Sequence, residues 1–316
     1  MKMSLQAARK LGLALLLMTG SPAAAADLTV GEGKTYALPS EAARAAQAGD
    51  VIKIFPGTYA DCARLDAKRL VIEGAGPNVV LAGKVCDGKG IFVISGNNIT
   101  IRRITFRSAR APNHNGAGIR AEGTNLTVED SQFIDNENGI LAAANAASTI
   151  AIINSTFRGN GNCIAACAHG IYAGHIALLR VENSKFEDQH VGHHIKSRAA
   201  RTEVIRNSIR DGLAGSASYL VDLPNGGSAL ISGNNFEKGP RSSNKGTAIA
   251  IGAEKETNPA GDIIVEDNSF SNDTGVATVF VQNYTGRPIA LLKNRLSGNV
   301  IPLNTVQPSQ EDKKTP

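Results

Sequence analysis

One short pattern recurs along most of the chain and restricts its fold more than any other feature. An apolar residue, two variable residues, an asparagine or serine, one variable residue and a second apolar residue follow in that order. The copies lie at 128–133, 152–157, 181–186, 204–209, 231–236, 265–270 and 291–296, with the related "IRRITF" at 101–106. Their last positions are 23 to 34 residues apart. Repeats of this length indicate a solenoid in which each copy marks one turn.

A second short strand lies between successive copies and usually begins with glycine. It is clearest at 118–122, 139–143, 170–174 and 194–198, and weaker at 220–224, 248–254 and 279–283. Stacking the equivalent strands of successive turns would form parallel sheets around one narrow core. The asparagines and serines would then form a ladder at one turn position and pair backbone groups from turn to turn. We therefore predict an all-β chain of roughly nine coils.

These features resemble the right-handed parallel β-helix of the pectate-lyase-like superfamily. The resemblance covers residues 51–303 and rests on the coil period, the Asn/Ser ladder and the glycine-led strand. The chain has 33 glycines, no tryptophan and only 4% aromatic residues, so strands joined by many turns suit it better than long helices. The resemblance implies a polysaccharide partner along one sheet, because many members act on uronic-acid chains. The fold by itself does not specify the reaction.

The two ends of the chain have different character from the repeats. Basic residues, the apolar run "LGLALLLM" and the small residues "SPAAAA" predict a signal peptide, which implies a secreted or periplasmic protein. An alanine-rich segment, with Ser40 as its expected N-cap, predicts a short helix that covers the open end of the solenoid. The predicted divisions are a signal peptide at 1–26, a strand and capping helix at 27–50, the β-helix at 51–303 and a disordered tail at 304–316.

The charge of the mature chain says little about its partner. Removing the signal peptide takes away Lys2, Arg9 and Lys10, which lowers the formal net charge from +5 to about +2. No phosphate-binding glycine loop occurs and basic residues are scattered, so we expect no nucleotide, nucleic acid or other cofactor. We also expect a monomer with no membrane span after the signal peptide is removed.

Four cysteines at 62, 86, 163 and 167 predict disulfides in an exported protein. Pairing by proximity joins Cys62 to Cys86 and Cys163 to Cys167. A zinc site is the alternative, but the "CIAAC" segment has no second close pair of cysteines to complete it. The connectivity therefore stays open at this point.

The strand at 194–198 lies in a stretch rich in basic and titratable side chains, "GHHIKSRAAR" at 192–201. Because side chains alternate along a strand, aligning the glycine-led strands places an aliphatic row inward: Ile119, Ile140, Ile171, Ile195 and Val221. The opposite parity places another row outward: Arg120, Leu141, Tyr172, Lys196 and Asp222. By the same count, His194 and Arg198 share the outward face with Lys196. Neighbouring rungs are ~4.8 Å apart, so these side chains are expected to lie close together.

All six histidines lie between residues 114 and 194, in the same few coils. Outward lysines and arginines on a solenoid are usually only solvated. A tyrosine, a lysine, an arginine and histidines at one place instead favour a functional site. We predict Lys196, Arg198, Tyr172 and His194 as catalytic residues, with substrate contacts from Arg120, His175, His193 and Asp222.

The chemistry that fits these residues is β-elimination of a uronate. Such a lyase neutralises the substrate carboxylate, removes the C5 proton and protonates the leaving C4 oxygen. Arg198 suits the carboxylate, because its planar guanidinium can bind both oxygens. Lys196 and His194 are rival bases, and Tyr172 could donate to the leaving oxygen. Outward carboxylates are too few for the calcium site or the aspartate group of other members, so we expect no metal.

Two other functions stay open. A C5-epimerase would begin with the same proton abstraction. A non-catalytic carbohydrate-binding or structural protein would carry aromatic platforms on its outer face, for which only Tyr172, Phe280 and Phe92 qualify.

Overall fold

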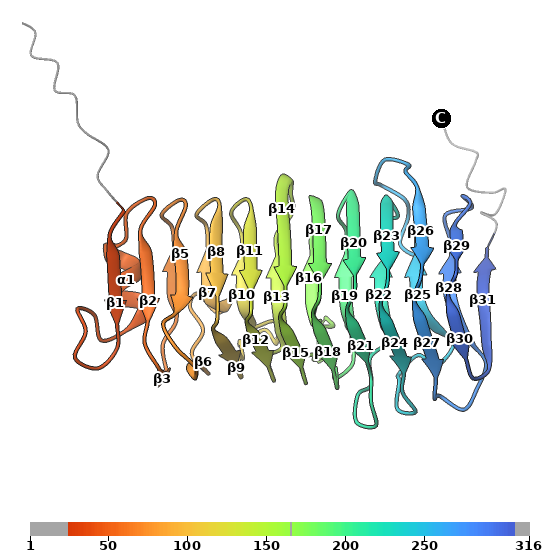
Figure 1. Ribbon diagram of the computed structural model, residues 1–316, viewed down its shortest axis with the longest axis horizontal. Helices are drawn as coiled ribbons and strands as arrows, with labels where there is room; N and C mark the ends of the chain where they lie inside the picture. The colour runs from red at the N-terminus through yellow and green to blue at the C-terminus, as the bar shows by residue number, and fades with distance from the viewer. Residues whose placement is uncertain (1–24, 165, 307–316) are drawn as a thin grey trace, which may run out of the picture.

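The structure, a computed structural model, is a long solenoid of parallel strands (Figure 1). It describes residues 25–164 and 166–306. The chain winds through three sheets in a fixed order, and every pair of neighbouring strands is parallel. The coils stack side by side from the red N-terminal end to the blue C-terminal end, so the two ends of the solenoid are far apart.

Each of the three sheets collects one strand from each coil. Sheet A contains β1 (Asp27–Val30), β2 (Val51–Ile54), β5 (Val71–Gly74), β8 (Ile99–Arg102), β11 (Leu126–Glu129), β14 (Asn145–Ile153), β17 (Ile176–Glu182), β20 (Arg201–Ile205), β23 (Ser228–Ser232), β26 (Ile263–Glu266) and β29 (Ala290–Leu292). Sheet B contains β3 (Gly57–Tyr59), β6 (Val79–Ala82), β9 (Thr105–Arg107), β12 (Gln132–Ile134), β15 (Thr156–Arg158), β18 (Lys185–Glu187), β21 (Ser208–Arg210), β24 (Asn235–Lys238), β27 (Ser269–Asn272) and β30 (Arg295–Ser297). Sheet C contains β4 (Ala63–Leu65), β7 (Gly90–Ile94), β10 (Ala117–Ala121), β13 (Asn138–Ala142), β16 (Ile171–Ala173), β19 (His193–Ser197), β22 (Tyr219–Leu223), β25 (Thr247–Ile251), β28 (Thr278–Asn283) and β31 (Val300–Thr305).

The repeat read from the sequence matches the register of sheet B. Its last apolar positions pair from strand to strand in one row: Phe106, Phe133, Phe157, Phe186, Ile209, Phe236, Phe270 and Leu296. Four of these rings stack in the core, with centroids 4.6 to 5.2 Å apart. The predicted polar ladder is also present, since Ser184 N donates to Asn207 Oδ1 and Asn207 N to Asn234 Oδ1, each at 2.8 Å. Sheets B and C each hold ten strands, whereas the pattern predicted roughly nine coils. The first two strands of sheet B, β3 and β6, come before the first copy of the pattern.

The glycines that lead the strands of sheet C make room for the phenylalanine stack. A Cβ built on Gly139 would lie 2.7 Å from Phe157 Cδ1 and 2.4 Å from the Gly170 carbonyl oxygen. A side chain at position 139 therefore does not fit unless the neighbouring ring or strand moves.

We expect Gly139→Ala to lower the free energy of unfolding by about 1 to 3 kcal/mol, the usual effect of overpacking a filled core. Chemical denaturation would measure the change. Gly246→Ala is the matched control, because its added Cβ would lie 3.5 Å from the nearest heavy atom, Asn244 Oδ1. Equal stability of the two variants would contradict the steric role assigned to Gly139.

The N-terminal end is covered by a helix, as predicted, but the helix begins earlier than expected. α1 (Pro39–Ala45) packs against β1, β2 and β4, and its Ala42 is fully buried. Its N-cap is Leu38, not Ser40, because proline occupies the first helical position and Ser40 lies inside the first turn. The Ser40 amide donates instead to Asp61 Oδ2 at 2.8 Å.

At the other end, β31 continues to Thr305, two residues beyond the predicted end of the β-helix, because it pairs with β28. Residues 307–316 of the predicted tail and residues 1–24 of the predicted signal peptide lie outside the described residues. Among the described residues, no helix is long and apolar enough to cross a membrane.

The four cysteines form two disulfides, Cys62–Cys86 and Cys163–Cys167. Proximity in the sequence therefore gave the correct pairing, and the zinc alternative is wrong. The second disulfide closes a small ring in the loop that leads to His169 and β16.

Candidate functional site

The outward side chains of sheet C form the column that the sequence predicted. Tyr172 pairs in register with Lys196, and Lys196 with Asp222. Arg198 follows β19, and its amide donates to the Ala173 carbonyl at 2.9 Å. The predicted inward row is buried in the core: Ile119, Ile140, Ile171, Ile195 and Val221. Alternation along the strands therefore brings four of the predicted residues to one place.

A carboxylate that the sequence analysis missed joins the two cations of this column. Glu254 Oε1 accepts from Lys196 Nζ at 2.6 Å, and Glu254 Oε2 accepts from Arg198 Nη2 at 2.5 Å. Arg198 also donates to Tyr172 Oη at 2.9 Å and to Asn225 Oδ1 at 2.6 Å. The pKa of Glu254 is lowered, because these hydrogen bonds and charges outweigh its desolvation. Lys196 and Arg198 are thus spaced to bind the two oxygens of one carboxylate.

Asp222 pairs with Lys196 on the neighbouring strand and is buried. Its Oδ2 is 3.1 Å from Lys196 Nζ and 3.4 Å from His193 Nε2, whereas its buried Oδ1 has no hydrogen-bond partner among the described residues. Burial raises the pKa of Asp222 to about 6, although the charge of Lys196 acts in the opposite direction. This carboxyl group can therefore gain or lose a proton near neutral pH.

Four rings line the start of the sheet C strands beside this column. Tyr172 stacks on His169, His169 on His193 and His193 on Tyr219, with centroids 5.6, 4.8 and 4.9 Å apart. His169 is almost fully buried, and its neighbours in the row are half-buried. The sequence placed His193 here but not Tyr219.

Backbone amides fix the tautomers of the two stacked histidines. His193 N donates to His169 Nδ1 at 3.0 Å, and Tyr219 N donates to His193 Nδ1 at 3.2 Å. Desolvation lowers the pKa of His169 to about 3 and that of His193 well below 6.5, and the charge of Lys196 adds to both effects. Both rings are therefore neutral at pH 7 with their proton on Nε2, and His193 directs that N–H toward Asp222. Neither ring has a free basic nitrogen at Nδ1.

His194 does not lie on the outward face, which corrects the prediction. It is 1% exposed, packs edge-on against Phe186 and contacts Asp211 Oδ1 through Nε2 at 3.0 Å. Its position corresponds to Gly139 in the glycine-led strands, where the backbone bends and two successive residues face the core. Strict alternation fails at this corner, so His194 cannot reach a ligand on the outer face of sheet C.

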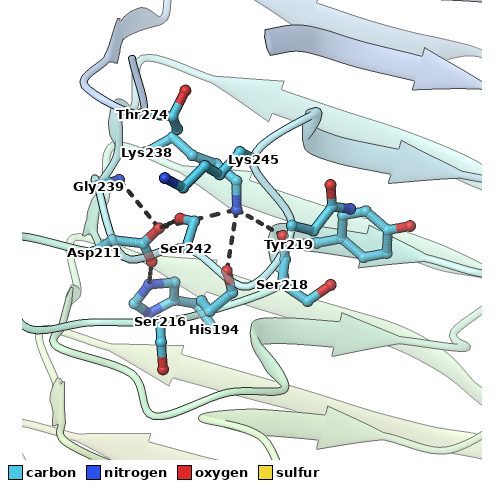
Figure 2. A network of polar contacts seen from close by, with 12 residues as sticks. His194, Asp211, Ser216, Ser218, Tyr219, Lys238, Gly239, Ser242, Lys245 and Thr274 are labelled. Carbon is cyan, nitrogen blue, oxygen red and sulfur yellow. Dashed lines mark hydrogen bonds and ion pairs between the residues drawn. The ribbon is translucent and has the colours of Figure 1, made fainter. Parts of the chain in front are cut away.

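His194 belongs instead to a buried polar network centred on Asp211 (Figure 2). Ser242 Oγ and the Gly239 amide donate to Asp211 Oδ2, and Lys238 Nζ lies 3.9 Å from the same oxygen. Lys238 and Asp211 are both completely buried. Burial lowers the pKa of Lys238 to about 8, although the charge of Asp211 acts in the opposite direction.

Two other predicted contacts lie apart from this group. Arg120 is on the same face but pairs with Leu141, two rungs before Tyr172, and its Nε is 3.2 Å from Glu122. His175 is exposed on the turn between β16 and β17 and makes no hydrogen bond or ion pair with a described site residue.

The aromatic residues suggested as outer platforms are also placed differently. Phe92 and Phe280 are buried in the core, so of the three suggested rings only Tyr172 lies on the outer face. In "AIAIGAE", Glu254 has the opposite parity to the inward Ile249 and Ile251, and this is the sequence signal that could have indicated it. No comparable signal identifies Asn225, because it follows a proline at the end of β22.

The geometry agrees with what comparison to known proteins finds. The family model described as "Right handed beta helix region" matches residues 70–209 and again 143–304. The chain belongs to this family. Its solenoid is accordingly right-handed, and the predicted resemblance is confirmed at the level of fold.

The solved structures that are similar to the chain share little sequence with it. ORF18 of Geobacillus virus E2 is 13% identical, with a TM-score of 0.55 over 85% of this chain and 56% of that one. The chain thus spans just over half the length of that protein. Pectin methylesterase PemA from Erwinia chrysanthemi (11% identity, TM-score 0.41, 94% and 96% coverage) and alginate lyase from Paenibacillus sp. (14%, 0.39, 87% and 99%) are polysaccharide-active neighbours. No curated protein matches the chain. Identities this low show the fold alone.

Proposed function

We propose that the protein is an exported lyase that cleaves a uronate-containing polysaccharide by metal-independent β-elimination. The observation that carries this proposal is the position of Glu254, whose two carboxylate oxygens contact Lys196 and Arg198. We infer that a uronate carboxylate takes the same place when substrate binds. Glu254 is half exposed, so its side chain can turn away into solvent.

The two cations supply the charge that elimination requires. Removing the C5 proton of a uronate places negative charge on the carbon and on its carboxylate. Arg198, fixed by Tyr172 and Asn225, would hold that charge throughout, and Lys196, held beside Asp222, would add its positive charge as it takes the proton. Preorganised donors of this kind stabilise the transition state more than they stabilise the ground state.

Asp222 makes Lys196 usable as the base. Lys196 as an ammonium cannot accept a proton, but it can pass one to Asp222, which is 3.1 Å away and has a pKa of about 6. The neutral amine then takes the C5 proton while the C4–O bond breaks and a C4–C5 double bond forms. Tyr172 Oη, which accepts a hydrogen bond from Arg198, would donate its proton to the leaving oxygen.

The direct test is to incubate the protein with alginate, pectate, glucuronan and glycosaminoglycans, with a chelator present, and to follow the ultraviolet absorbance of the new double bond. Absorbance that rises with one substrate supports the proposal. Chain binding with no absorbance would contradict it and favour a binding protein. Exchange at C5 with inversion, seen by proton NMR without cleavage, would instead favour the epimerase.

Activity is expected to rise as the pH passes through about 6, because Asp222 must be ionised to receive the proton of Lys196. Asp222→Asn should lower kcat by about 10²-fold, and its residual activity should not rise in this range. The pH profile of kcat measures both effects.

Stability gives a control that does not depend on activity. The pKa of Asp222 is raised on folding, so its contribution is fully present below about pH 4 and is lost as the pH rises through about 6. The Tm of Asp222→Asn should therefore not show the decrease that Asp222 causes in the wild-type protein as the pH rises from about 4 to about 6. A wild-type activity profile that is flat between pH 5 and 7 would overturn the role of Asp222.

A further inference from the structure

The buried lysine of Figure 2 lies at the far end of a continuous chain of polar contacts that reaches the candidate site. Lys238 Nζ donates to the carbonyl oxygens of Ala217 at 3.2 Å and Ser218 at 2.6 Å. The Ser218 carbonyl and the Tyr219 amide belong to the same peptide group. That amide donates to His193 Nδ1 at 3.2 Å.

From His193 the contacts continue to the proposed base. His193 Nε2 faces Asp222 Oδ2 at 3.4 Å, and that oxygen is 3.1 Å from Lys196 Nζ. Lys238, Asp222 and Lys196 are buried and the side chain of His193 is only 12% exposed, which leaves little solvent to screen one charge from the next. A cation on the carbonyl side of a peptide polarises it and makes its N–H a stronger donor.

We propose that Lys238 is a positioning residue, which acts through the 218–219 peptide to hold His193 in its neutral tautomer with the Nε2 proton directed at Asp222. Its counterion Asp211 keeps this otherwise isolated charge in the interior, and Asp211 is itself bound by His194, Ser242 and the Gly239 amide. His194, which we predicted to be catalytic, therefore supports this network instead.

Tying the loop before β22 in place requires only a donor to the two carbonyls. The charge of Lys238 also contributes to the lowered pKa of His193, after desolvation and the effects of His169 and Lys196. The titratable groups that face Lys238 are Asp211, on the loop after β21, and through it His194 on β19.

The test is nitrogen NMR of the full chain labelled at histidine, with the His193 signals assigned from His193→Gln. We expect His193 Nδ1 to be unprotonated, and its shift to change with a midpoint near pH 8 as Lys238 loses its proton. Lys238→Met, which keeps the length of the side chain but removes its charge, should abolish that change. Lys245→Met replaces an exposed lysine of the neighbouring loop and should retain it.

The consequence for catalysis rests on the proposed function and is measured separately. Lys238→Met should lower kcat on the order of tenfold with KM unchanged, the size of effect that outer hydrogen-bond partners have at other sites. A folded Lys238→Met with wild-type His193 signals would overturn the inference. If this variant does not fold, a wild-type titration without a change near pH 8 would overturn it. Absence of activity on every substrate would contradict the proposed function. The NMR result would then decide the role of Lys238 by itself.

Discussion

Replacing Arg198 with alanine is expected to lower kcat/KM by about 10²- to 10³-fold, the usual effect of removing one donor that stabilises a developing negative charge. Arg198 contacts Tyr172, Asn225 and Glu254, so its guanidinium is held in place before substrate arrives. Arg198→Lys should recover only part of the loss, because an ammonium cannot bind two oxygens with the same fixed geometry. Steady-state kinetics on the substrate found by absorbance would measure both variants.

The matched control for Arg198 is Arg201→Ala. Arg201 is also paired with a glutamate, Glu203 at 2.7 Å, but it lies in sheet A and is more than half exposed. Its replacement should leave kcat/KM within about twofold, since exposed ion pairs contribute little. Equal activity of Arg198→Ala and Arg201→Ala, with both folds intact by circular dichroism, would remove Arg198 from the proposed site.

Replacing Asp211 with alanine is expected to lower the free energy of unfolding by about 3 to 5 kcal/mol, which is typical when one partner of a buried ion pair is removed. The side chain is completely buried and holds His194, Ser242 and the Gly239 amide, and it is the counterion of Lys238. All four groups would lose a partner in the interior. Denaturation in urea at pH 7 would measure the change.

The pH dependence of that effect has a definite sign. Hydrogen bonds and the charges of His194 and Lys238 outweigh desolvation and lower the pKa of Asp211. Its contribution is therefore present above its unfolded pKa of about 4 and is lost as the pH falls through the lower folded value. Asp267→Ala replaces a more exposed aspartate on a turn and serves as the control. A loss for Asp211→Ala no larger than that of the control would contradict the importance assigned to the network.

Much of the fold follows from local rules that the sequence displays directly. Phe106, Phe133 and Phe157 recur at nearly constant spacing, and the structure places them in one row of sheet B. The parity of side chains along a strand then separates Ile195 from Lys196, and it placed Tyr172, Lys196 and Asp222 on successive rungs. These predictions succeeded because strand alternation and coil stacking are set by residues close in the sequence.

The same rule failed where the backbone bends. His194 has the parity of Lys196, yet it faces the core together with Ile195, because two successive side chains point inward near the start of β19. Phe280 is buried for a related reason: it occupies the equivalent corner position and stacks on Phe270. Strict alternation fails near the start of these sheet C strands, and the sequence does not mark where this happens.

The sequence by itself therefore determined the architecture and the column containing Tyr172, Lys196, Arg198 and Asp222, and the structure decided between the disulfide pairings that the sequence left open. Only the tertiary structure decided which groups that column meets. Glu254 lies 58 residues from Lys196 in the chain. It reaches Lys196 because the strand before it, β25, is only two rungs from β19 in sheet C. The route from Lys238 to His193 likewise crosses three strands. Contacts of this kind depend on the path of the loops and on burial, and burial also sets the pKa values of Asp222 and His193.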